Sequence, residues 1–383
     1  MRISKIVVAV VAATSLGLLA GCGGGSGGTD SGSSSASAAD TQKAQAAQQK
    51  VDAAKAIPGT EDLGPAIDVS SLKGKTIYSI PIDSKAEFYQ AGEAAMKIVA
   101  EKAGVGFVTF PSDGTQTSYQ QGIAQAINAK AGAILLNGPL PSTLGPQIDD
   151  ATKAGVPVIP LHLSDKDTPP NTGLKYEAFA PFNEAAHLMT LNAIGAAKGT
   201  PIHALVIQAS ETGPSKGMVD TIQKALADEG PAGSDATVIN VAVPQWSQQI
   251  QSQVQSALLK NPNINAVLPI YDSMALYAAP GIQQAAGGRE VPIYTFNGTP
   301  SILKMVQDGT VAMDVAENPD WVAYVNIDVA FRAMLGAPPV PAESGPVRVI
   351  DKSNVAETGN PPQSGKGFGD TYAGAFMKLW GLG

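Results

Sequence analysis

Residues Asn261–Pro319 read NPNINAVLPIYDSMALYAAPGIQQAAGGREVPIYTFNGTPSILKMVQDGTVAMDVAENP. Short apolar runs alternate here with segments that carry apolar side chains at helical spacing. In chain order, the predicted strands and helices are 266–270, 273–286, 292–296, 301–308 and 311–316. The links between them are short, and strands that alternate with helices in this way are typical of βαβ units in a parallel sheet.

Polar residues stand where each of these strands ends. Tyr271 and Asp272 follow the first strand, Asn297 follows the second and Glu317 follows the third. In open parallel sheets, ligands bind outside the carboxyl ends of the strands. These residues are therefore predicted to belong to a ligand site, together with Asn137 at the end of an earlier strand.

The same alternation runs through the preceding part of the chain. Strands are predicted at 76–81, 106–110, 133–137, 157–161, 203–208 and 237–243. Helices are predicted at 88–103, 118–130, 142–154, 183–198, 215–228 and 248–260. Continuous apolar strands suit sheets that are covered on both faces. Two successive doubly wound α/β halves are the simplest account, and a single long sheet is the alternative.

Three segments resemble the type I periplasmic-binding-protein family, in its ribose-binding-like branch. YDSMALYA at 271–278 is similar to an NDxMALGA-like segment of that family, FNGTP at 296–300 to an FDGxP-like segment, and ENP at 317–319 to a later Gln-x-P. The resemblance covers about residues 72–351. It implies two Rossmann-like lobes with parallel sheets, joined by three hinge crossings.

The resemblance also implies how the chain is divided. The hinge crossings are expected near 179–181, 316–319 and 346–348. The expected parts are a signal peptide at 1–21, a lipid-anchored flexible linker at 22–71, an N-terminal lobe at 72–179 plus 318–346, a C-terminal lobe at 180–317 plus 347–363, and a tail at 364–383. The tail carries Tyr372, Phe376 and Trp380 at helical spacing, which favours packing on a lobe over binding a partner.

The first residues have the features of an export signal. Arg2 and Lys5 precede the apolar run 6–19, which is too short for a spanning helix. Leu19-Ala20-Gly21-Cys22 resembles the lipobox of bacterial lipoproteins, which implies cleavage before Cys22 and acylation of its sulfur. An ordinary signal peptide with a chance cysteine is the alternative. Cys22 is the only cysteine, so the sequence contains no disulfide framework.

The segment after Cys22 is predicted to be a spacer. Residues 23–39 are rich in Gly, Ser and Ala and are expected to form a flexible tether. Residues 40–56 have high helix propensity but hardly any apolar stripe. They are expected to form a marginal, solvated helix that extends the spacer, and a coiled-coil partner site is the alternative.

Composition and motifs exclude several classes of function. The net charge is −8, and removing residues 1–21 takes away two positive charges and changes it to −10, which disfavours nucleic-acid binding. The three histidines, His162, His187 and His203, form no zinc-protease motif, and no nucleophile elbow, phosphate loop or dinucleotide fingerprint occurs. No catalytic residue, metal or cofactor is therefore predicted.

Aromatic residues complete the predicted site. Phe88 and Tyr89 resemble the family's aromatic pair at the start of the first helix, and Trp246 resembles the aromatic residue of the opposite lobe. Aromatic faces suit the C–H faces of sugars and also planar rings. Core packing is an equal alternative for Phe88, whereas the polar neighbours of Trp246 favour a role in the site.

The polar positions depart from the family's sugar-binding pattern. His162-Leu163 replaces an Asp-Arg pair, and Lys216 replaces an arginine at the start of a helix. Tyr271, Asn297 and Glu317 stand where the family has Asn, Asp and Gln. Carboxylates and bidentate arginines grip vicinal hydroxyls better than these groups do. A sugar is still the expected ligand, while Lys216 and His162 leave room for a solute with a carboxylate or another acceptor.

The resemblance implies an extracytoplasmic substrate-binding lipoprotein of an ABC importer that closes two lobes over a small solute. Its expected partners are the solute, a permease in the membrane and the lipid anchor, and a monomer is expected. The expected location is the periplasm or the outer face of the cytoplasmic membrane. A sensor that presents its closed form to a membrane signalling receptor is the alternative function.

Overall fold

The computed structural model describes residues 36–60, 63–168 and 172–383. The first sheet is parallel throughout, with the strand order β2-β1-β3-β4-β5. Its strands are β1 (Thr76–Pro81), β2 (Gly106–Thr109), β3 (Ala133–Asn137), β4 (Val158–Asp165) and β5 (Ala178–Ala180). This order, with the chain running outward in both directions from the middle of the sheet, is that of a doubly wound fold.

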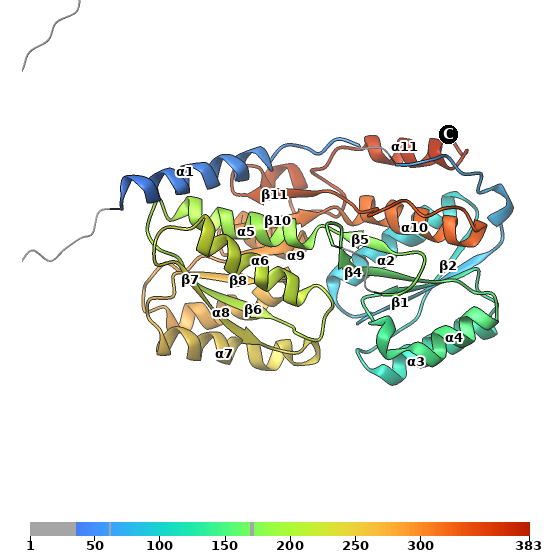
Figure 1. The fold of residues 1–383 in the computed structure, drawn as a ribbon, viewed down its shortest axis with the longest axis horizontal. Coiled ribbons are helices and arrows are strands. Elements are labelled where there is room, and N and C mark those ends of the chain that lie inside the picture. Colours follow the sequence, from blue (N-terminus) through green and yellow to red (C-terminus); the bar gives the residue numbers. More distant parts are fainter. Residues whose placement is uncertain (1–35, 61–62, 169–171) are drawn as a thin grey trace, which may run out of the picture. The chain divides into compact units, whose positions relative to one another are not determined.

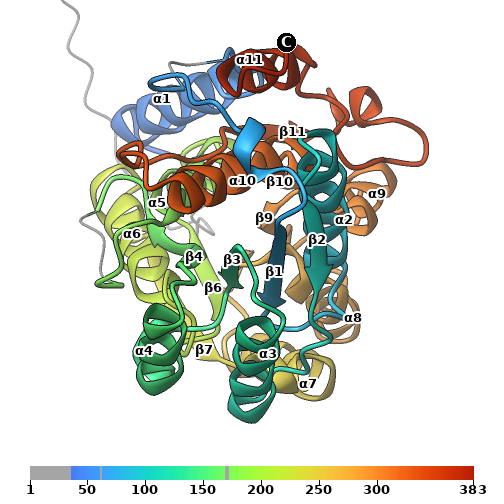
Figure 2. The same cartoon turned by 90° about the vertical axis from the view of Figure 1, so that its right-hand side faces the viewer.

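Helices cover both faces of this first sheet (Figure 2). They are α2 (Glu87–Lys102), α3 (Gln116–Asn128), α4 (Gly145–Lys153) and α10 (Pro319–Leu335). Met96 and Val99 of α2 belong to a core that includes Ile77 and Leu135 of the sheet. Residues of α3 and α4 form a separate core with alternate residues of the same strands, because successive side chains along a strand point to opposite faces.

The second lobe has six strands in two three-stranded ladders. They are β6 (His203–Gln208), β7 (Asp235–Asn240), β8 (Ala266–Pro269), β9 (Tyr294–Asn297), β10 (Met313–Glu317) and β11 (Val347–Asp351). The ladders have the orders β7-β6-β8 and β11-β10-β9, and a parallel bridge between Val267 and Ile293 connects them. Only β11 runs antiparallel, against β10.

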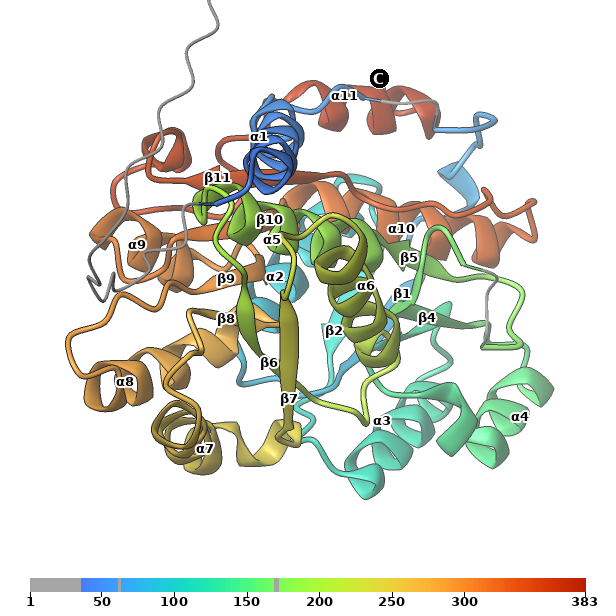
Figure 3. The same ribbon diagram turned by 60° about the vertical axis from the view of Figure 1, so that its left-hand side comes forward.

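The helices of the second lobe pack in pairs, α5 against α6 and α7 against α8. Their bounds are α5 (Phe182–Ala196), α6 (Ser215–Asp228), α7 (Trp246–Lys260), α8 (Ala275–Ala285) and α9 (Pro300–Asp308). Figure 3 shows the strands of this lobe between the two pairs. The predicted architecture of two doubly wound α/β lobes with parallel sheets is thus confirmed.

The chain passes between the two lobes close to the expected crossings. β5 of the first sheet ends at Ala180, and α5 of the second lobe begins at Phe182. β10 ends at Glu317 and leads directly into α10, which packs on α2 of the first lobe. The chain then returns through β11. Short single-turn helices occupy the links: η1 (Ser70–Leu72), η2 (Pro141–Thr143), η3 (Val243–Gln245), η4 (Asp272–Met274) and η5 (Val355–Thr358).

The prediction of a solvated spacer helix within the linker 22–71 is wrong for its described part. Helix α1 (Ala38–Ala53) packs along α5 (Figure 1). Ala44, Ala47 and Val51 are buried in this contact. The Nζ atom of Lys43 donates to the Gly230 carbonyl at 2.7 Å. Small residues spaced along one face allow close helix contact without a strong apolar stripe, and the composition concealed this.

The segment after α1 connects the two lobes. Val349 of β11 donates its N–H to the Ala54 carbonyl at 2.9 Å, and Lys55 pairs with Asp351 at 2.7 Å. Further along, the buried Arg332 of α10 donates to the Pro65 carbonyl at 3.0 Å. Residues 54–55 therefore bond to β11 and Pro65 bonds to α10, so these described parts of the segment belong to the folded body rather than to a tether.

The C-terminal tail packs on the first lobe, as expected from its aromatic spacing. Helix α11 (Thr371–Leu379) contacts α10. Tyr372 stacks on Trp321 with ring centroids 4.5 Å apart. Trp380 is completely buried and lies edge-on to Phe331. The predictions for residues 1–35, namely the signal peptide, Cys22 and the tether as far as residue 35, lie outside the described residues. The predicted tether runs to residue 39, and its last two residues belong to α1 instead.

Candidate functional site

A pocket lies where carboxyl ends of strands from both lobes meet. Its volume is about 60 Å³. At about 10–15 Å³ for each water, that is room for roughly four to six water molecules or one small solute. The lining residues are Ile82, Asp83, Ala86, Phe88, Tyr89, Gly138, His162, Leu163, Phe182, Thr212, Pro214, Val243, Trp246, Tyr271, Ser273 and Asn297.

The four predicted aromatic residues all line this pocket. Phe88 and Tyr89, at the start of α2, lie edge to face with ring centroids 5.3 Å apart. From the other lobe come Trp246 and Tyr271, with ring centroids 6.1 Å apart. Trp246 was predicted in the loop between the strand 237–243 and the helix 248–260, but it is the first residue of α7. The pocket thus has an aromatic wall from each lobe.

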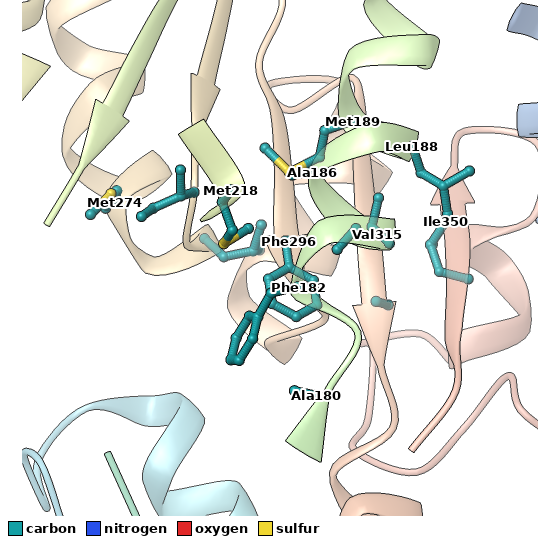
Figure 4. Packing of buried hydrophobic residues seen from close by; sticks show 14 of the residues in the cluster. Ala180, Phe182, Ala186, Leu188, Met189, Met218, Met274, Phe296, Val315 and Ile350 are labelled. Atoms are coloured by element: carbon teal, nitrogen blue, oxygen red, sulfur yellow. The ribbon is translucent and has the colours of Figure 1, made fainter. Parts of the chain in front are cut away.

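The wall beneath these rings consists of Phe182 and the residues packed on it. His162 lies edge-on to Phe182 at 5.5 Å between ring centroids, and Phe182 lies edge-on to Phe296 at 5.9 Å. Figure 4 shows Phe182 and Phe296 side by side at the edge of the second lobe's core. Phe182 is the first residue of α5, so the chain's first crossing between the lobes supplies part of the pocket.

His162 and Asn297 are positioned by unusual backbone conformations. The backbone angle φ is 58° at His162 and 149° at Asn297, and residues other than glycine rarely adopt such positive values. His162 lies within β4, which extends to Asp165 and so is longer than predicted. Backbone strain of this kind concentrates at functional sites, where the surrounding structure maintains it.

A buried pair of polar groups lies at one end of the pocket, with His162 in the wall and Glu317 behind it. His162 Nε2 and Glu317 Oε1 lie 3.2 Å apart, and their side chains are 7% and 1% exposed. The ring and the carboxylate are not aligned for a hydrogen bond, so neither atom has a hydrogen-bond partner. Asn297 Nδ2 donates to the other oxygen of Glu317 at 3.3 Å. His162 and Asn297, which both line the pocket, are thus held against the same carboxylate.

Two buried carboxyl groups support the turn that carries Asn297. Asp314 accepts from the N–H groups of Asn297 and Gly298 at 3.2 and 3.3 Å. Asp272 accepts from the Thr299 N–H at 2.7 Å. Burial raises the pKa of Asp272 to about 7, and burial together with the nearby Asp272 raises the pKa of Asp314 well above its usual range.

Lys216 does not belong to the pocket, contrary to the prediction. Its side chain is 86% exposed and forms an ion pair with Asp220, one helical turn along α6. Thr212 and Pro214, just before α6, line the pocket instead. Lys216 lies on the opposite face of the helix start, an outcome that depends on helix rotation and not on sequence position.

Three other predicted residues lie behind the pocket wall rather than on it. Asp272 is fully buried by its role at the turn before α9. Glu317 and Asn137 line a smaller neighbouring cavity, which shares Phe88 and His162 with the main pocket. The side chain of Asn137 donates to Glu93 at 2.9 Å and is therefore already engaged.

Gly138 is a lining residue that was not predicted. Its φ is +102°, and a Cβ atom there would lie 2.9 Å from the Tyr89 hydroxyl and 3.0 Å from Ile82 Cβ. Only glycine therefore lets Tyr89 approach this closely. Its place directly after the strand that ends at Asn137 is the one sequence signal that could have identified it. Ile82, Ala86, Phe182 and Val243 have no such signal, because apolar residues beside strands are common.

Two further observations concern the described residues alone. Within 36–60, 63–168 and 172–383, no helix combines the length and apolar character needed to cross a membrane. In that same part of the chain, no three His, Cys, Asp or Glu side chains gather in a way that could hold a metal ion.

Comparison with known sequences places this fold in a family. The family model for a periplasmic binding protein domain matches residues 77–338. The ribose import binding protein of Salmonella typhimurium is 35% identical over 83 residues, which are 22% of this chain and 28% of that protein. The D-apiose import binding protein of Actinobacillus succinogenes is 24% identical over 61% of this chain and 73% of that protein. The chain thus matches only about a quarter of the length of the ribose import binding protein.

Solved structures show the same fold. A 5-methylthioribose transporter solute binding protein from Thermotoga lettingae superposes with a TM-score of 0.65 at 16% identity, covering 82% of this chain and 99% of that one. A glucose-galactose binding protein from Geobacillus stearothermophilus superposes with a TM-score of 0.64 at 19% identity, covering 74% and 99%. At these identities the likeness concerns the fold alone.

Proposed function

The chain belongs to the periplasmic binding protein family, and from this premise we propose that it binds a small solute between its lobes and delivers it to an ABC importer. The observation that carries the proposal is the pocket beside the carboxyl ends of the strands, to which both lobes contribute aromatic side chains. Ligands of two-lobed α/β proteins bind at such edges, where closure of the lobes surrounds them.

A binding role, rather than catalysis, fits the polar groups of the pocket. The relatives described above are named as binding proteins. His162 faces Glu317, and Ser273, the serine of the pocket, donates to Asp272 at 3.2 Å. A nucleophile would need a base within hydrogen-bond reach, and here serine and histidine have separate partners.

The names of relatives suggest a sugar or a sugar derivative as the solute. Ribose and D-apiose import are named for two relatives, and 5-methylthioribose is bound in one structural neighbour. The last of these carries an apolar methylthio group on a sugar. Sugar-like solutes are therefore part of the proposal.

Closure of the lobes is the first expected result. Glu87 of α2 accepts from the Ser301 N–H of α9 at 3.2 Å, so this hydrogen bond joins the lobes in the conformation described. Glu87→Ala should favour the open form and increase the radius of gyration of the solute-free protein in small-angle scattering. A bound solute should restore the wild-type value. An unchanged radius in the variant, with and without a solute that binds, would argue for a rigid scaffold.

Membrane attachment through Cys22 is the second expected result. The run Leu19-Ala20-Gly21-Cys22 supports acylation of this single cysteine. A modified cysteine with two or more acyl chains anchors a protein stably, whereas the loss of all chains releases it. Cys22→Ala should therefore move the protein from the membrane fraction to the soluble extracytoplasmic fraction, while Ser26→Ala in the same segment should not. Unchanged membrane attachment and lipid labelling in Cys22→Ala would refute the lipoprotein assignment.

A further inference from the structure

The chemistry of the pocket wall limits the kind of solute that fits it. Among the lining residues, the titratable side chains are those of Asp83, Tyr89, His162 and Tyr271, and the other polar ones are Thr212, Ser273 and Asn297. The remaining residues are apolar, aromatic or glycine. A solute with hydroxyl groups on every edge would place several of them against apolar side chains, where an unpaired buried polar group is unfavourable.

No cationic side chain of the described residues lines the pocket. The arginines of this part of the chain have other partners. Arg289 donates to the carbonyls of Pro262 and Ile264, Arg332 pairs with Asp328, and Arg348 donates to the Lys55 carbonyl. The pocket therefore offers no bidentate guanidinium for vicinal hydroxyls and no charge partner for an anion.

Most polar groups at the pocket are already engaged with the protein. Thr212 and Tyr271 share a hydrogen bond of 2.8 Å between their hydroxyls. The indole N–H of Trp246 donates to the Val241 carbonyl at 3.0 Å. His162 and Asn297, which both line the pocket, meet at one end of it, where each lies against an oxygen of the Glu317 carboxylate. Two polar lining residues therefore gather there, while the aromatic walls supply contact area.

We propose that the solute is a neutral molecule with an apolar or aromatic ring face and a hydrogen-bonding group at one end, which meets His162 and Asn297. The inference rests on the proposed function, because it assumes that this pocket is the solute site. Phe88 and Tyr89 on one side, and Trp246 and Tyr271 on the other, contact the two faces of the ring. Free polyhydroxylated sugars bind more weakly, because the walls leave their outer hydroxyls without partners.

Fluorescence titration and calorimetry of the whole mature chain test this inference. The probes are D-ribose and myo-inositol as polyhydroxylated solutes, 5-methylthioribose as a sugar with an apolar arm, and phenol and benzyl alcohol as aromatic rings with one hydroxyl. Trp321 and Trp380 are buried in the α10–α11 contact, so Trp246 is the tryptophan that reports on the pocket. We expect 5-methylthioribose to bind at least tenfold more tightly than ribose, and both aromatic probes to shift the Trp246 emission.

Variants connect the result to the pocket. Trp246→Ala should weaken binding of 5-methylthioribose tenfold or more, and Trp246→Phe should retain most of it. Glu317→Gln should weaken binding of 5-methylthioribose and of ribose by similar factors, so that the preference of the protein for 5-methylthioribose is unchanged. Lys216→Met is the matched control, because this exposed side chain lies outside the pocket. The affinity of this variant for 5-methylthioribose should stay within twofold of the wild-type value. Melting curves of every variant identify any that fail to fold.

The outcomes separate the two proposals. Tighter binding of ribose or myo-inositol, with closure of the lobes, would overturn the apolar-solute inference and leave the transport function standing. If none of the three apolar-faced probes binds or shifts the Trp246 emission, the inference is likewise overturned. If Lys216→Met abolishes binding and Trp246→Ala does not, the solute site lies elsewhere and both proposals lose their basis.

Discussion

Trp380→Ala is expected to destabilise the protein by about 3–5 kcal/mol, the usual cost of truncating a fully buried tryptophan. The indole is completely buried, and its ring lies 5.0 Å from that of Phe331 and 5.7 Å from those of Tyr324 and Phe376. Its Nε1–H donates to Asp328, which also accepts from Arg332. The alanine variant therefore leaves a cavity and removes one hydrogen bond from a buried carboxylate.

Thermal or urea unfolding of the mature protein measures this effect. Leu382→Ala is the matched control, because Leu382 lies two residues further along the same tail and is 37% exposed. Its free energy of unfolding should change by less than about 1 kcal/mol. Equal losses in the two variants would contradict the conclusion that the tail belongs to the core of the first lobe.

The stability of the protein is expected to fall as the pH rises from about 5 to 8. Burial raises the pKa of Asp272 to about 7, from the ordinary 3.8 that applies to the unfolded chain, and the nearby Glu87 adds to the shift. The folded state therefore binds more protons than the unfolded state between these values. The contribution is fully present below the unfolded pKa and is lost as pH rises through the folded pKa. For Asp272 alone, a shift of this size corresponds to at most about 4 kcal/mol.

Asp272→Asn isolates this contribution from other titrating groups. The amide can still accept from the Thr299 N–H but carries no titrating proton. The difference in melting temperature between pH 5 and pH 8 should therefore be smaller in the variant than in the wild type. Burial also raises the pKa of Asp314, so the stability of the Asp272→Asn variant should still fall as the pH rises, but by less than that of the wild type. Identical pH dependence in the two proteins would show that Asp272 does not titrate in this range.

Local patterns predicted the alternation of strands and helices, and the family resemblance predicted two lobes joined by three crossings. Each predicted strand of residues 261–319 is present, with ends shifted by a few residues, because short apolar runs between helical segments have few other ways to bury themselves. The strand ends also located part of the pocket, since Tyr271 and Asn297 line it. The aromatic residues Phe88, Tyr89 and Trp246 were placed there by the family resemblance, and all three line it.

Tertiary packing decided the remaining features, because each depends on the direction of a side chain or on a contact distant in sequence. Lys216 is two residues beyond Pro214, yet helix rotation directs it away from the pocket. Helix α1 docks on α5 through alanines, which carry almost no signal of burial in the sequence. His162 and Glu317 are 155 positions apart, and only the approach of β4 and β10 at the hinge brings their unpartnered atoms to 3.2 Å.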